Sequence, residues 1–153
     1  MNTIAVHLDE RTMADLRTRR AELRESMSAL ELALAAPRAD PGRWLERVHA
    51  ALVELDGDLR THVEITEGEG GRHADVAEVA PRLAGPAGQL ADEHGVARRL
   101  IDDLLAQPAA LDRADLGQVR TRANELLAML VRHRQRGADL VYEAYQVDVG
   151  GET

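Results

Sequence analysis

Three histidines of this chain, His62, His94 and His133, each occupy a position at which the spacing of apolar residues along a predicted helix indicates a core residue. Each of them belongs to a different predicted helix. Imidazole is the commonest neutral metal ligand in proteins, and histidines that project inward from facing helices are a standard way to hold a metal ion inside a helical bundle. These three side chains are therefore candidate ligands for a cation.

The stripes that contain them repeat in alternating steps of three and four residues, a spacing that keeps one face of a helix toward its neighbours. The first predicted helix has such a stripe too, and Arg20 is its one charged residue. Each helix thus carries one long polar side chain on its inward face. The four stripes are Met13, Leu16, Arg20, Leu23, Met27, Leu30 and Leu34; Leu45, Val48, Leu52, Leu55, Leu59, His62 and Thr66; Leu83, Ala87, Leu90, His94, Ala97, Ile101 and Leu104; and Leu126, Leu130, His133, Gly137, Leu140 and Ala144.

Composition also favours helices. Phenylalanine is absent, aromatic residues make up only 2% of the chain, and Ala, Leu, Glu and Arg dominate, whereas sheets need β-branched and aromatic residues. A chain of 153 residues is long enough to bury a sizeable core as one unit. We therefore predict an all-α fold with a single domain over residues 1–153, in which 1–8 and 149–153 are mobile tails.

Local signals mark the first two helices. Asp9 is a candidate N-cap of the first, which should end before Pro37 because proline disfavours helix in the residue that precedes it. Asp40 followed by Pro41 is a favourable start for the second helix. The aspartate side chain can accept hydrogen bonds from the first backbone N–H groups, which have no acceptor within the helix, and proline has no N–H that needs one. Glycines that follow Glu67 should end the second helix.

The longest loop is predicted over Gly68–Pro86, and Pro81 and Pro86 leave the start of the third helix open. Pro108 should close that helix, and Asp112 should cap a fourth that continues to about residue 148. Short connections predict an up-down-up-down bundle with antiparallel neighbours. The midpoints between successive polar stripe residues fall in or beside the predicted connections, so the four polar side chains should share one layer.

The charge and the cysteine count exclude several classes. A net charge of −8 opposes generic nucleic-acid binding, and the arginine-rich runs 17–24 and 132–136 are interpreted as solvated faces. Cysteine is absent, which excludes disulfides and thiolate metal sites. No membrane segment is expected, because no stretch approaches eighteen consecutive apolar residues and residues 1–11 lack a signal-like pattern. A cytoplasmic protein is the simplest expectation.

Three segments carry a family resemblance: LRTHVEITE over 59–67, LADEHGVARRL over 90–100 and LLAMLVRHRQR over 126–136. They resemble the second, third and fourth helices of the hemerythrin-like, or HHE cation-binding, family. The resemblance implies a four-helix bundle with His62, His94 and His133 as ligands. Intact members hold two irons through five histidines and two bridging carboxylates, and bind oxygen or sense oxygen, redox state or iron.

The chain departs from that pattern at three positions. Thr66 stands where a glutamate should follow His62 by one turn, and Glu67 is displaced by about 100° around the helix. Gly137 replaces the carboxylate of the fourth helix, and the first-helix histidine is either replaced by Arg20 or lost near His7. We therefore expect no intact di-iron centre. The expectation is one iron or other divalent cation on His62, His94 and His133, with water or Glu67 completing its coordination.

A second interpretation stays open. Arg20 would supply a fixed positive charge in place of the metal, paired with Asp58 or with Glu93, so that the layer is a structural or pH-responsive polar network in a scaffold that acts through a protein partner. Glu46 and His49 form one Glu-x-x-His pair. Ferritin-like metal sites require two such pairs, and the sequence has no second one. Enzymatic turnover is not predicted, and the sequence names neither a partner nor a homodimer interface.

Overall fold

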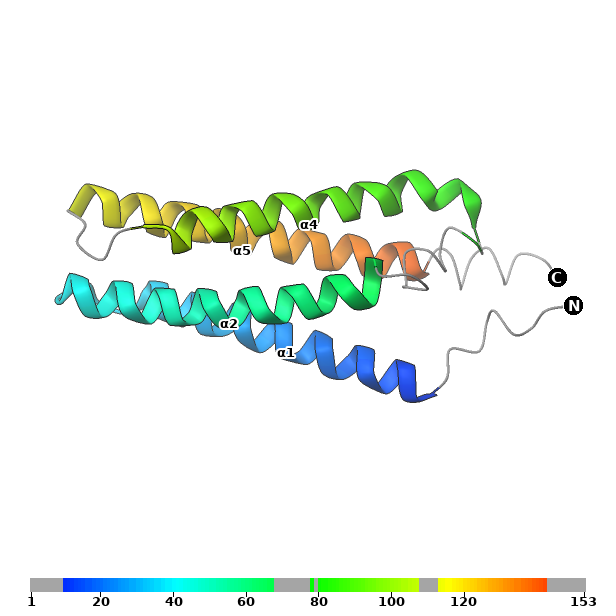
Figure 1. Cartoon of the computed structure of the whole chain (residues 1–153), viewed down its shortest axis with the longest axis horizontal. Helices are drawn as coiled ribbons and strands as arrows, with labels where there is room; N and C mark the ends of the chain where they lie inside the picture. The colour runs from blue at the N-terminus through cyan, green and yellow to red at the C-terminus, as the bar shows by residue number, and fades with distance from the viewer. Residues whose placement is uncertain (1–9, 68–77, 79, 108–112, 143–153) are drawn as a thin grey trace, which may run out of the picture.

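The computed structural model describes residues 10–67, 78, 80–107 and 113–142, and within these ranges the chain is helical apart from residues 36–40, 80 and 106–107 (Figure 1). The long helices are α1 (Glu10–Ala35), α2 (Pro41–Glu67), α4 (Ala84–Leu105) and α5 (Arg113–Tyr142), and a short 3₁₀ helix, η2 (Pro81–Leu83), precedes α4. No strand occurs in the described ranges, so the prediction of an all-α fold is confirmed there. The tails predicted at 1–8 and 149–153 lie outside the described residues.

The predicted start of α2 is confirmed in atomic detail. Asp40 caps the helix, because its Oδ1 accepts from the backbone N–H of Arg43 at 3.2 Å. The carbonyl oxygen of Asp40 accepts from the N–H of Trp44 at 3.0 Å, which closes the first turn. Pro41 is the first helical residue, where the lack of an N–H costs nothing.

The loop predicted over Gly68–Pro86 is wrong for its last residues. Pro81–Leu83 form the 3₁₀ helix and α4 begins at Ala84, so Pro86 lies in the first turn of a helix. The first four amides of a helix have no intrahelical acceptor, and a proline is therefore tolerated there. Residues 68–77 and 79 lie outside the described part, as do the predicted cap Asp112 and the continuation of the last helix beyond Tyr142.

The long helices lie lengthwise beside one another (Figure 1). α1 packs along α2 and α4 packs along α5, while α2 also contacts α4 and α1 contacts α5. Each helix therefore has two neighbours and turns one face inward. No helix among the described residues is long and apolar enough to cross a membrane.

The predicted stripes form the core. All seven members of the third stripe are buried, six of them in α4 and Leu83 in η2. In the other three stripes every apolar side chain that the structure describes is buried as well, while those of Met13, Leu16 and Ala144 lie outside the described part. The core falls into a large cluster and a small one on α4, α5 and η2. The small cluster comprises Ala80, Leu83, Ala87, Leu90 and Leu140.

Candidate metal centre

The structure brings His62, His94 and His133 together from α2, α4 and α5. The ring centroids of His94 and His133 are 4.2 Å apart, those of His62 and His94 are 5.3 Å apart, and those of His62 and His133 are 6.2 Å apart. Each ring offers one ligand nitrogen, and these three atoms all lie within 4.8 Å of one another. The predicted meeting of three imidazoles in one layer is therefore confirmed.

The layer lies between the two apolar clusters. Leu90 of the small cluster is one turn before His94 on α4, and Ala97 of the large cluster follows at nearly the same spacing. His94 is only 2% exposed and His133 only 6%, whereas His62 is half-buried. His62 is thus the most exposed of the three rings.

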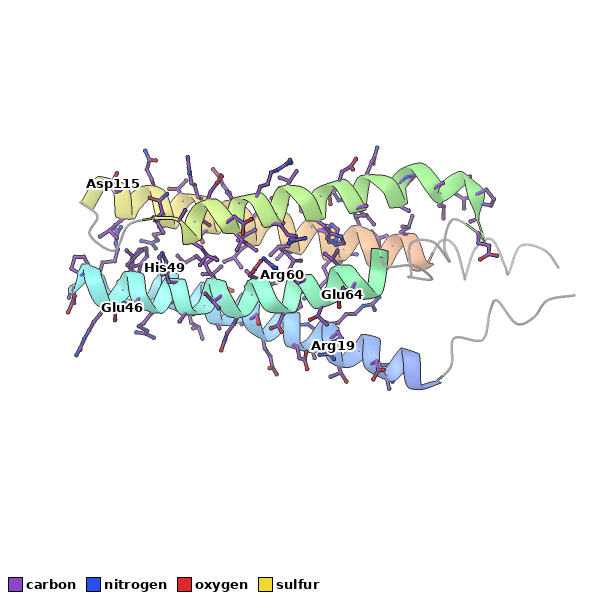
Figure 2. All side chains as sticks on the ribbon, in the orientation of Figure 1. Arg19, Glu46, His49, Arg60, Glu64 and Asp115 are labelled. Carbon is purple, nitrogen blue, oxygen red and sulfur yellow. The ribbon has the colours of Figure 1, made fainter. Side chains whose placement is uncertain are left out.

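Figure 2 labels residues of α2 on either side of His62 in the sequence, and also the Glu46 and His49 pair. Arg60 and Glu64 are labelled near the end of α2 and bracket His62 in the sequence, while Glu46 and His49 lie toward the start of that helix. Glu46 is exposed and His49 is half-buried. The pair is therefore remote from the histidine layer along α2 and contributes nothing to it.

Burial keeps the clustered imidazoles uncharged. The pKa of His94 falls from its ordinary 6.5 to about 3 because the ring is buried, and the nearby His133 and His62 lower it further. Burial also lowers the pKa of His133, although the hydrogen bond and the negative charge of Glu93 oppose that effect. Both rings are thus neutral near pH 7, and a neutral imidazole is the form that binds a metal.

A carboxylate reaches the layer from outside the three-histidine cluster. Glu93 Oε2 lies 2.9 Å from Nδ1 of His133, and Glu93 Oε1 lies 2.6 Å from a guanidinium nitrogen of Arg136. Arg136 is exposed, as the interpretation of 132–136 as a solvated face predicted, and it also pairs with Glu93 of the neighbouring helix. A signal was present in the sequence, because Arg136 follows His133 by three residues and so shares its side of the helix.

The other predicted members of the layer are placed less completely. Arg20 is half-buried on α1. Two carboxylates were predicted as alternative partners for it. Asp58 accepts a hydrogen bond from the hydroxyl of Ser26, and Glu93 contacts His133 and Arg136. The side chains of Thr66 and Glu67 lie outside the described part, so the proposed ligand Glu67 is not located. Ser26 was not predicted to have a role.

A single ion fits this donor set better than two. A tetrahedral ion with nitrogens at about 2.0–2.1 Å holds them roughly 3.4 Å apart. The ligand atoms here lie within 4.8 Å of one another, so drawing them onto one ion takes side-chain movements of about 1 Å. Among the described residues no carboxylate belongs to the cluster, and bridging carboxylates are what a second ion would require.

Space exists for a Cβ at Gly137, the position where the family resemblance predicted a carboxylate. Gly137 is half-buried, one turn beyond His133, and a Cβ built there would meet nothing within 4 Å. Comparison with known proteins found no family model, no curated protein and no solved structure that matches the chain.

Proposed function

We propose that this chain is a hemerythrin-like, up-down-up-down four-helix bundle that binds one iron or other divalent cation through His62, His94 and His133. The role that this proposal implies is sensing of oxygen, redox state or the metal itself, without enzymatic turnover. The resemblance of the three histidine segments to the HHE cation-binding family suggests the role, and the ligand cluster supports the binding.

One observation carries the proposal: three ligand nitrogens from three helices lie within 4.8 Å of one another in the core. A single buried histidine is often a core residue with a hydrogen bond. Three imidazole rings at one level, drawn from separate helices, are arranged as a metal-binding bundle requires. A bound ion would supply positive charge and, where its coordination is incomplete, a place for a small ligand.

The direct test is metal analysis of protein purified without chelators, together with its near-ultraviolet and visible spectrum. We expect about one equivalent of a divalent transition metal, recovered after chelation by anaerobic addition of ferrous iron or of another divalent ion. Less than about one tenth of an equivalent, with no recovery after any of these additions, would refute cation binding.

A second function is favoured by the contacts within the layer itself. Glu93 joins His133 to Arg136, so part of the layer is already satisfied by protein groups. In this alternative the histidines form a structural network in a metal-free scaffold that acts through a protein partner. Replacing His94 by Leu separates the two: a marked gain in stability without loss of any bound ion supports the scaffold.

A further inference from the structure

The contact between Glu93 and His133 determines which nitrogen of the imidazole can bind a metal. A carboxylate oxygen accepts hydrogen bonds, so at the 2.9 Å separation Nδ1 of His133 is the protonated nitrogen. In the neutral ring the lone pair then lies on Nε2, across the imidazole from Glu93. The hydrogen bond thus fixes both the tautomer and the orientation of this ring.

Arg136 holds the other oxygen of the same carboxylate. Its guanidinium lies 2.6 Å from Oε1 of Glu93, and the Glu93 side chain is only 20% exposed. Both oxygens of Glu93 are therefore engaged, one by each partner, which restricts its rotamer. Metal-bound histidines commonly donate their second nitrogen to a carboxylate in this way, and such partners tune affinity although they do not touch the metal.

The chemistry of the donors limits the ion. Mg²⁺ and Ca²⁺ require oxygen ligands, and the common non-haem ferrous site combines two histidines with a carboxylate. The described cluster offers three imidazole nitrogens and no oxygen. Three histidines with a fourth position left to water form a standard four-coordinate zinc site, and Zn²⁺ lies above Fe²⁺ in intrinsic affinity for such ligands.

We infer that Glu93 and Arg136 are positioning residues that present Nε2 of His133 to a four-coordinate Zn²⁺ ion held by His62, His94 and His133. This inference rests on the proposed cation binding and makes it specific, because it names the ion, the coordinating atom of one ligand and the two residues that orient it. Since Zn²⁺ has no redox chemistry, the inference retains sensing of the metal itself among the proposed roles and excludes oxygen or redox sensing at the ion.

The experiment titrates chelator-treated protein with Zn²⁺, Co²⁺ and anaerobic Fe²⁺ against a competing chelator. We expect one equivalent of Zn²⁺, bound roughly tenfold or more tightly than Fe²⁺. Co²⁺ should give the intense visible absorption of four-coordinate cobalt. In zinc-loaded protein, nitrogen NMR of His133 should show the metal on Nε2 and the proton on Nδ1.

Variants test the positioning residues. Glu93→Ala should weaken Zn²⁺ binding by about 10–100-fold. Glu93→Gln keeps an oxygen that can accept from Nδ1, so its loss should be smaller than that of the alanine variant. Arg136 is half exposed, and Arg136→Met should cost about fivefold or less. Asp92→Asn, an exposed neighbour on α4, is the matched control and should leave binding unchanged.

The outcomes separate this inference from the proposal on which it rests. If the wild-type protein binds none of the three ions, cation binding itself fails. If it binds Zn²⁺ but folded Glu93→Ala binds equally well, or if the NMR places the metal on Nδ1, the positioning role is overturned while cation binding stands. Tighter binding of Fe²⁺ than of Zn²⁺ overturns the assignment of the ion. The NMR measurement needs no variant, so it decides the coordinating atom even if Glu93→Ala does not fold.

Discussion

Acid should destabilise the metal-free protein through His94, and replacement of this residue by leucine should remove that contribution. Burial, with the adjacent His133 and His62, holds the pKa of His94 at about 3 in the folded state, against an ordinary value of 6.5. The unfolded chain therefore binds a proton that the folded state resists. Such a group contributes its stability above pH 6.5 and loses it as the pH falls from 6.5 toward 3.

The size of the effect follows from the pKa difference. At pH 7 the imidazole is mostly uncharged in both states, so His94 adds almost nothing to the pH dependence. At pH 5, about 1.5 pH units below the ordinary pKa of 6.5, the unfolded chain is favoured by about 2 kcal/mol, because each unit corresponds to about 1.36 kcal/mol. The loss should continue to grow down to the folded pKa.

The assay is urea denaturation of chelator-treated wild type and His94→Leu at pH 7 and at pH 5. Carboxylates and the histidines outside the layer titrate in both proteins, so the difference between the two pH-dependent losses reports the contribution of His94 together with its coupling to His133 and His62. We expect the wild type to lose about 2 kcal/mol more than the variant. Equal losses in the two proteins would refute the argument that this ring is held neutral by burial.

Three further predictions concern α2 and α5. Gly57→Ala should stabilise the protein by about 0.5–1 kcal/mol, seen as a higher urea midpoint with an unchanged slope, because a Cβ there meets nothing within 4 Å. Asp40→Ala should lower the free energy of unfolding by about 1 kcal/mol through loss of the helix cap, and Asp40→Ser should restore most of it. Gly137→Glu should strengthen metal binding by roughly tenfold, since it places a carboxylate one turn beyond His133. Gly137→Gln, which adds no charge, should not strengthen it, and equal metal affinities of the two variants would contradict this reasoning.

Features that depend on local periodicity were predictable. The six buried positions of α4 and Leu83 of η2 were all identified, because a step of three or four residues fixes which side of a helix a residue occupies. Asp40 was identified as a cap because the orphan amides of a helix start are a local need. The start of α4 was not predicted, since Pro81 and Pro86 are each compatible with a loop or with the first turn of a helix.

Contacts between helices were harder to predict. The pairing of Glu93 with His133 and Arg136 joins α4 to α5, and it depends on the rotation and the level of two helices relative to each other. An error of one residue in level moves a side chain by about 1.5 Å, which is enough to exchange one partner for another. The same reason explains why Ser26 was not foreseen as the partner of Asp58.

The sequence by itself determined that the chain is helical, that each long helix turns one apolar face inward, and that three of those faces carry a histidine. Only the tertiary structure decided that the three rings lie within reach of one ion and that Glu93 orients His133. The physical reason is that helix periodicity is set within one turn, whereas the meeting of side chains from different helices is set by the packing of the whole core.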